Sequence, residues 1–175
     1  QKFIGTRNPK LSVKGSDSWK KSVSEAKQSA EDQARELLAV YAERARTQGF
    51  AYSEPDQTYA EFEARFPYTE TRDQLRAIRK IIAEMCSTIP MDHLLCGDVG
   101  FGKTEVAMRA AMKAVLDGKQ VVVLVPTTIL ASQHTKSFID RFSYAHFRIA
   151  QLSRFITPEK QREVKDGLRR GDIDI

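Results

Sequence analysis

The chain has 175 residues, of which 41% are hydrophobic and 29% are charged, and its formal net charge is +5. This composition is ordinary for a globular protein of one domain or parts of two, and a basic balance permits contact with nucleic acid without proving it. The sequence has no run of about 18 apolar residues, no apolar signal-peptide core at its N-terminus, and no C-x-x-C pair from Cys86 and Cys96. We therefore expect a cytoplasmic protein with reduced thiols, no membrane contact and no structural zinc site.

The first 50 residues predict a short β tail followed by a long helix. Residues 3–4 and 11–13 are typical of short strands, so residues 1–15 resemble the end of a preceding module. A helix is predicted from Ser16, because small or apolar residues recur at steps of three and four, and Gly49 is a plausible stop. Its thin, alanine-rich stripe favours a spacer or a helix that lies along another surface. An ordinary packed helix is the open alternative.

Two shorter helices are predicted next. Residues 56–65 place Tyr59 and Phe62 on one face, and Phe66-Pro67 ends this helix. Residues 71–85 form the second helix, whose inward positions are Leu75, Ile78, Ile81 and Ile82.

From residue 91 onward the pattern alternates between strands and helices. The strands are predicted at 93–96, 121–125, 147–152 and from 172, and the helices at 103–116, 128–142 and 158–170. The β-branched run at 121–125 is typical of a parallel strand that is buried on both faces, and Thr157-Pro158 suits a helix start. We therefore expect an α/β fold with an incomplete parallel sheet built from right-handed crossover units.

One motif predicts a phosphate site. Residues 97–104 spell G-x-x-x-x-G-K-T, the P-loop pattern, formed by Gly97, Asp98, Val99, Gly100, Phe101, Gly102, Lys103 and Thr104. A strand that ends in a glycine turn and opens a helix directs backbone N–H groups at one point, where anionic phosphate is stabilised. Lys103 can reach the β- and γ-phosphates, and the Thr104 hydroxyl can ligate Mg²⁺, so ATP and Mg²⁺ are the expected ligands. The alternative is a glycine turn that binds nothing.

Upstream, Thr71-x-x-Gln74 has two interpretations. As a capping box, Thr71 caps a helix and Gln74 returns to the cap N–H. As a base reader, the Gln74 amide offers one donor and one acceptor to the edge of adenine, and Phe66 could stack on the base. The two interpretations can coexist.

These motifs resemble those of a known family. Residues 90–111, PMDHLLCGDVGFGKTEVAMRAA, closely resemble motif I of the bacterial transcription-repair coupling factors. Residues 125–134 are similar to the family's motif Ia, residues 66–74 to its Q-type motif, and residues 153–155 also have a counterpart. The resemblance covers essentially the whole chain. It implies the tail of an RNA-polymerase-interacting module at 1–15, a connector helix at 16–50, and the first part of a RecA-like helicase ATP-binding domain, a P-loop NTPase sheet, at 51–175.

The resemblance implies a superfamily 2 translocase on double-stranded DNA. Such a motor hydrolyses ATP between two RecA-like lobes, removes stalled RNA polymerase from damaged DNA, and couples transcription to nucleotide excision repair proteins. Carried over residue by residue, it assigns nucleotide binding to 97–104, catalysis to Lys103 and Thr104, and adenine to Phe66, Thr71 and Gln74. It assigns DNA-backbone contact to Thr127, Thr128, Gln133 and Arg154, for which a helix cap and a solvated surface are the alternatives.

The chain also departs from this family. An acidic D-E-x-x box should follow the strand that begins at Asp172, and the 175 residues contain neither this box nor a second lobe. We therefore expect nucleotide binding without turnover by this segment alone. Three other interpretations stay open: a branch-migrating helicase relative, another P-loop enzyme such as a kinase or transporter ATPase, and a non-catalytic module that binds nucleotide or a partner.

Overall fold

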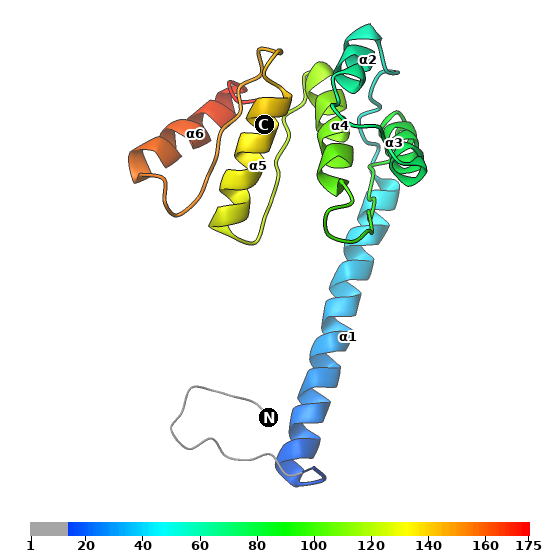
Figure 1. The fold of residues 1–175 in the computed structure, drawn as a ribbon. Helices are drawn as coiled ribbons and strands as arrows, with labels where there is room; N and C mark the ends of the chain where they lie inside the picture. The colour runs from blue at the N-terminus through cyan, green and yellow to red at the C-terminus, as the bar shows by residue number, and fades with distance from the viewer. Residues whose placement is uncertain (1–13) are drawn as a thin grey trace. The chain divides into compact units, whose positions relative to one another are not determined.

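The computed structural model describes residues 14–175, and these residues form six α-helices (Figure 1). The strands predicted at 3–4 and 11–13 lie outside the described residues. The chain divides after Gln48 into two compact units, which are described separately. No helix in the described part of the chain combines the length and apolarity that are needed to cross a bilayer.

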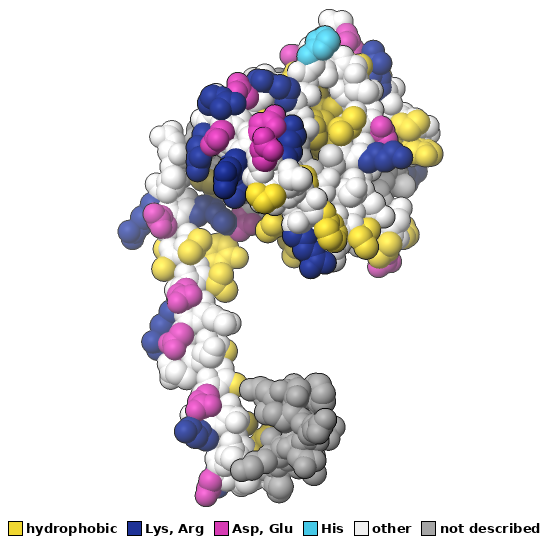
Figure 2. All heavy atoms as spheres, turned by 90° about the vertical axis from the view of Figure 1, so that its left-hand side faces the viewer, with side chains coloured by type: hydrophobic (Ala, Val, Ile, Leu, Met, Phe, Trp, Pro, Cys, Tyr) yellow, Lys and Arg dark blue, Asp and Glu magenta, His cyan; other side chains and the backbone are white. Residues whose placement is uncertain are grey.

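The first unit contains α1, Asp17–Arg46, which is 30 residues long. Ser16 is its N-cap, because the Trp19 N–H donates to the Ser16 hydroxyl at 3.2 Å. Thr47 ends the helix in an extended conformation, so the expected stop at Gly49 is wrong by two residues. No residue of α1 is buried, and both charged and hydrophobic side chains lie on its exposed surface (Figure 2). The long helix and its cap are confirmed.

The core of the second unit lies around α2, Gln57–Ala64, α3, Arg72–Met85, and α4, Lys103–Leu116. Helix α4 packs against both α2 and α3. The three helices begin and end within one or two residues of the predicted bounds, and the predicted inward residues are buried, except that Leu75 is half-buried. The side chains that form this core are Tyr59, Phe62, Ile78, Ile81, Ile82, Met85, Val106, Met108, Ala111, Met112, Ala114, Val115, Phe138 and Phe142.

Two further helices complete the second unit. Helix α5 is Thr128–Arg141, and its Phe138 ring stacks on that of Phe142, the C-cap, at 5.6 Å between centroids. The Phe142 ring in turn lies 5.0 Å from that of Phe62 on α2. Helix α6, Pro158–Arg170, begins after the Thr157 cap with a proline in its first turn, as predicted, and ends at Gly171 in the left-handed conformation.

The described residues contain no β-strand, so the predicted parallel sheet is not confirmed. Three of the predicted strand segments nevertheless meet at their ends. The Val121 N–H donates to the Asp174 carbonyl at 2.8 Å, and the Asp174 N–H donates to the Arg148 carbonyl at 2.9 Å. The expectation that 121–125 is buried on both faces is wrong, because Val122 is 81% exposed and Leu124 is 94% exposed. Among residues 14–175, no segment covers these two side chains.

Candidate functional site

The P-loop residues form a turn that leads directly into α4. Gly100 has φ of +86° and Gly102 has φ of +70°, values that favour glycine because it carries no Cβ. Gly102 is the N-cap of α4, and no side chain caps this helix. The first N–H groups of a helix have no partner inside the helix, so an uncapped start of this kind offers donors and a positive dipole end to an anion.

Lys103 lies against the backbone of the same turn. Its Nζ donates to the carbonyl oxygen of Gly97 at 2.5 Å and to that of Asp98 at 2.6 Å. A bound phosphate would have to replace these carbonyl oxygens as the acceptor. The next residue, Thr104, is half-buried in the first turn of α4. The two residues that the motif predicts to hold phosphate and Mg²⁺ therefore lie side by side at the start of one helix.

Gln74 connects the Q-type motif to the P-loop. The capping box is confirmed, since the Gln74 N–H donates to the Thr71 hydroxyl at 3.2 Å and the Thr71 N–H donates to Gln74 Oε1 at 2.8 Å. Gln74 Nε2 also donates to the carbonyl oxygen of Phe101 at 3.0 Å. These bonds use one of the two amide N–H groups and one of the two lone pairs on Oε1. One donor and one acceptor remain, which is the pair that adenine requires, so the two interpretations of Gln74 are compatible.

Glycine at position 102 also leaves room for this contact. A Cβ built on Gly102 would collide with Gln74 Nε2. The glycine therefore serves both the left-handed turn and the close approach of the Gln74 amide. Gln74 and Phe101 are 27 positions apart in the sequence, and the fold brings them into direct contact.

The two aromatic residues upstream of Gln74 differ in how exposed their rings are. Phe66 is half-buried, and the guanidinium carbons of Arg109 and Arg141 lie 5.6 Å and 5.7 Å from its ring centre. Tyr68 touches Phe66 edge-on at 5.5 Å between centroids but is 74% exposed. Phe66 is thus engaged in packing, whereas Tyr68 has a ring that is open to a ligand. Sequence reasoning missed Tyr68, although its position in the same segment was a usable signal.

A cavity of about 740 Å³ connects this segment to the start of α4. Phe66 and Tyr68 line it from the loop between α2 and α3, and Thr104 lines it from α4. Helix α5 contributes Asp140 and Arg141. Gln74 and Lys103 are not among its lining residues. The structure therefore brings Phe66 and Thr104 to one cavity, and Gln74 and Lys103 to the P-loop turn.

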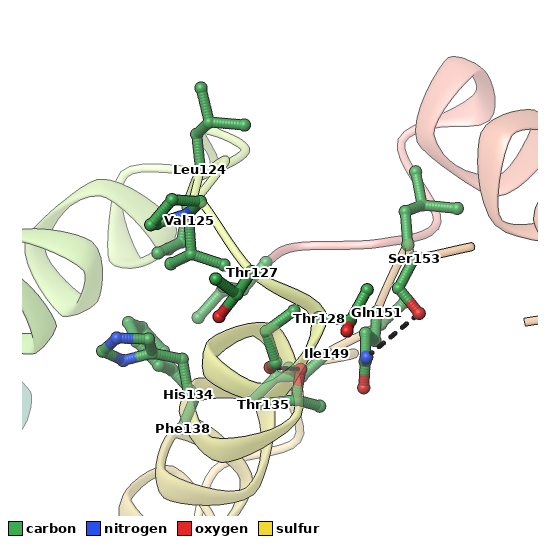
Figure 3. A pocket seen from close by; sticks show the side chains of 16 residues that line it. Leu124, Val125, Thr127, Thr128, His134, Thr135, Phe138, Ile149, Gln151 and Ser153 are labelled. Carbon is green, nitrogen blue, oxygen red and sulfur yellow. Dashed lines mark hydrogen bonds between the residues drawn. The ribbon is translucent and has the colours of Figure 1, made fainter. Parts of the chain in front are cut away.

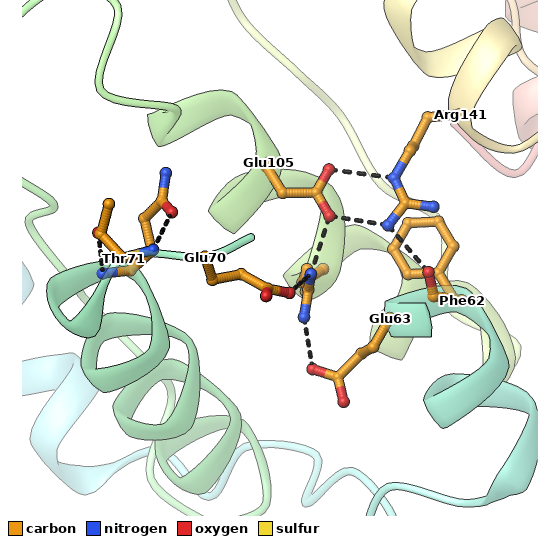
Figure 4. A network of polar contacts seen from close by, with 8 residues as sticks. Phe62, Glu63, Glu70, Thr71, Glu105 and Arg141 are labelled. Atoms are coloured by element: carbon orange, nitrogen blue, oxygen red, sulfur yellow. Dashed lines mark hydrogen bonds and ion pairs between the residues drawn. The ribbon is translucent and has the colours of Figure 1, made fainter. Parts of the chain in front are cut away.

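A buried ionic network lies behind these residues (Figure 4). Arg109 is 1% exposed, and its guanidinium donates to Glu105 at 3.0 Å, to Glu63 at 2.7 Å and to Glu70. Glu105 also accepts from Arg141, at 2.8 Å and 3.1 Å. The hydrogen bond from Arg109 is the main reason that the pKa of Glu70 lies below its usual value. Sequence reasoning missed this network, for which the four-residue spacing of Glu105 and Arg109 was a signal.

The four predicted DNA contacts divide into two groups. Thr127 caps α5, because its hydroxyl accepts from the Leu130 N–H at 3.2 Å, so the cap interpretation is confirmed for this residue. Thr127 and Thr128 line a cavity of about 300 Å³ at the start of α5, together with Ser153 (Figure 3). Gln133 and Arg154 are exposed and do not line this cavity. The Arg154 guanidinium lies 5.0 Å from the centre of the Phe155 ring.

Comparisons with known proteins extend these observations. Residues 71–175 match the family model described as DEAD/DEAH box helicase. Over the whole chain, the sequence is 48% identical to the transcription-repair-coupling factor of Bacillus subtilis and 47% identical to that of Staphylococcus aureus. The chain spans 15% of the length of each of these relatives. It is also similar to a solved structure of RecG bound to a three-way DNA junction, with a TM-score of 0.72 and 37% identity over 78% of this chain and 19% of that one.

Proposed function

Because this chain belongs to the DEAD/DEAH box helicase family, we propose that it supplies the ATP-binding part of a DNA-translocating ATPase. The observation that carries the proposal is the hydrogen bond from Gln74 to the carbonyl of Phe101, which joins a potential base reader to a phosphate-binding turn. A kinase or transporter ATPase is disfavoured, because the family match includes the Q-type residues Thr71 and Gln74 as well as the P-loop.

The residues present suit ATP. The uncapped start of α4 and the left-handed glycines of the turn form a cradle for phosphate. In this proposal, the backbone of 97–102 and the Lys103 ammonium bind the triphosphate, while Phe66, Thr71 and Gln74, together with Tyr68, hold adenine. Thr104 offers the hydroxyl that ligates Mg²⁺, which neutralises charge on the phosphates when it is bound.

The proposed fold is a RecA-like parallel sheet that is incomplete in this chain. Its support is the likeness to the RecG structure and the hydrogen bonds that join 121, 148–150 and 174–175. The proposed organisation is a β tail at 1–15 from an RNA-polymerase-interacting module, a connector helix at 16–50 and a helicase ATP-binding domain from 51.

The whole motor is proposed to act on double-stranded DNA and stalled RNA polymerase, and with nucleotide excision repair proteins. The relatives' name, transcription-repair-coupling factor, supports these partners. Such a motor would act in the cytoplasm, where bacterial DNA and its polymerase are. Thr127, Thr128, Gln133 and Arg154 would contact DNA phosphates, because hydroxyl, amide and guanidinium groups bind phosphate oxygens without reading sequence.

A branch-migrating DNA helicase is the second candidate, and the likeness to RecG favours it. The coupling-factor assignment has broader support, because 48% identity over 100% of the chain exceeds 37% identity over 78%. The two candidates differ in their substrate. A coupling factor displaces a stalled polymerase, whereas a branch-migrating helicase moves a DNA junction.

Release of phosphate from ATP tests the proposal. The 175-residue chain should release none above background, with or without DNA, because an arginine finger alone contributes about 10³–10⁵ in rate and the sequence has no acidic Mg²⁺ box. A longer chain that carries this segment and an acidic box should hydrolyse ATP faster with double-stranded DNA, and Lys103→Ala should abolish this activity. Steady turnover by the 175-residue chain that survives Lys103→Ala would contradict the proposal.

A further inference from the structure

Arg109 holds three separate carboxylates from the interior of the second unit. Its Nε contacts Glu105 on α4, one Nη contacts Glu63 on α2, and the other Nη contacts Glu70 in the loop before α3. The guanidinium is planar and offers donors in fixed directions, so one arginine can hold three elements at once. Lysine has a single ammonium on a flexible stem and cannot reproduce this geometry.

Two contacts of Arg109 fix the segment that leads to Gln74. The Arg109 guanidinium lies over the Phe66 ring and binds Glu70. Glu70 directly precedes Thr71, the N-cap that is joined to Gln74 by the two bonds of the capping box. The path from Arg109 to the Gln74 amide therefore consists of one ion pair, one peptide bond and one helix cap.

We propose that Arg109 is a positioning residue that sets the base preference of the nucleotide site, an inference that rests on the proposed ATP-binding function. Residues 67–70 lie between α2 and α3 and belong to neither helix, and the Arg109 contacts hold Phe66 and Glu70 against α4. Hydrogen bonds weaken steeply when the angle at the hydrogen falls below about 120°. A Gln74 amide that moves relative to the P-loop would therefore distinguish adenine from guanine poorly, while the phosphate cradle stays in place.

Loss of Arg109 will also destabilise the fold, because three carboxylates lose a buried partner. The same helix provides a matched control. Lys113 is 2% exposed, pairs with Asp117 at 3.1 Å and donates to the Ser53 hydroxyl at 2.6 Å. Neither of these partners lies in the segment 66–74. Lys113→Met thus removes a buried cation from α4 without releasing the Gln74 segment.

The test is calorimetric titration of the 175-residue chain with ATP, GTP and inorganic tripolyphosphate. In Arg109→Met, the preference for ATP over GTP should fall by about tenfold, which is the change in affinity expected when one hydrogen bond to the base is lost. Tripolyphosphate affinity should change by less than about twofold, because it reports only the P-loop cradle. Lys113→Met should keep the preference. Arg109→Lys should not restore it.

Four outcomes decide between the proposals. If folded Arg109→Met keeps the preference of the wild type, the positioning role is wrong and the ATP function stands. If Arg109→Met does not fold, Glu70→Ala, which leaves Arg109 two carboxylates, must lose the preference, and its retention overturns the inference. If the wild type binds ATP and GTP equally, base reading by Gln74 fails, and the role of Arg109 fails with it. If the wild type does not bind tripolyphosphate either, the P-loop assignment itself is wrong.

Discussion

The side-chain amide of Gln74 donates to the backbone carbonyl oxygen of Phe101, with 3.0 Å between nitrogen and oxygen. This bond joins the first turn of α3 to the turn that precedes α4. The same amide closes the capping box with Thr71. A change in the P-loop turn is therefore transmitted to the start of α3, and a change in the cap is transmitted to the P-loop.

The substitution Gln74→Glu distinguishes the role of Gln74 in the capping box from its role in base recognition. Glutamate at this position still accepts from the Thr71 N–H, so the capping box and the stability of α3 should be retained. The carboxylate has no N–H to donate to Phe101 or to a base. The difference in binding free energy that favours ATP over GTP should fall by about 1–3 kcal/mol. Calorimetry of both nucleotides measures it, and the comparison is Gln74→Ala, which loses both the bond from the Thr71 N–H to the side chain and the base reader. Full preference in Gln74→Glu would limit Gln74 to the cap.

Gly102→Ala tests the close approach of Gln74, and Gly118→Ala is its control. Both glycines have φ of +70°, so alanine carries the same left-handed strain, about 1–2 kcal/mol, at either position. A Cβ at Gly118 has no atom within 4 Å, whereas a Cβ at Gly102 meets the Gln74 amide. Gly102→Ala should therefore lower the free energy of unfolding further than Gly118→Ala and should alone weaken ATP binding. Equal losses in denaturant titrations would show that the contact contributes nothing.

Acid should weaken the fold partly through Glu70. The hydrogen bond from Arg109 lowers the pKa of Glu70 below its usual value of 4.5. A carboxylate with a lowered pKa in the folded state contributes stability that is present above its unfolded pKa and is lost as pH falls through the folded one. The free energy of unfolding should thus decrease below about pH 4.5, and less steeply in Glu70→Gln. Denaturant titrations between pH 6 and pH 3 measure this, and identical slopes would exclude a contribution from Glu70.

The helices could be predicted from the sequence because local signals define them. Caps at Ser16, Asp56, Thr71 and Thr157, and an apolar spacing of three and four, are properties of neighbouring residues. The strands could not be confirmed in the same way, since a strand depends on partners that are distant in sequence. The apolar run at 121–125 predicts burial, but Val122 and Leu124 are exposed among the described residues.

The candidate site was predicted in its parts but not in its connections. The binding roles of Gly97–Thr104 and of Gln74 could be predicted from the sequence motifs alone. The contact between Gln74 and Phe101, and the contacts of Arg109 with Glu63 and Glu70, join residues that are 27 to 46 positions apart. Only the packing of α2 and α3 against α4 brings them together, and no local pattern encodes that packing.

Arg154→Ala should weaken DNA binding without affecting stability. Arg154 is exposed, so its guanidinium is available to a phosphate. Affinity for a labelled duplex should fall equally for different sequences, and the slope of log K against log salt should decrease by about 1. Arg162→Ala, an exposed arginine on α6, is the control of equal charge. Fluorescence anisotropy at several salt concentrations measures the effect. A loss that depends on base sequence, or an equal loss in Arg162→Ala, would contradict phosphate contact by Arg154.

Thr127 and Thr128 should respond differently to alanine. Thr127 caps α5, so Thr127→Ala should destabilise the protein by about 1 kcal/mol in addition to any loss of DNA affinity. Thr128 lines the same cavity without serving as the cap, so Thr128→Ala should reduce DNA affinity and leave stability almost unchanged. Thermal unfolding and duplex binding of both variants distinguish these effects. Unchanged duplex affinity in both variants would restrict Thr127 to its capping role.

Binding of ATP with Mg²⁺ to wild type and Lys103→Ala is the most direct test of the central claim that 97–104 form the nucleotide site. The wild type should bind ATP weakly, with a dissociation constant in the high micromolar range or above, because one lobe supplies only part of the site. Lys103→Ala should weaken binding further, since the ammonium that lies in the P-loop turn is lost. Lys165→Ala, which removes an exposed charge from α6, should bind as the wild type does. Equal heats and affinities for wild type and Lys103→Ala would contradict the assignment.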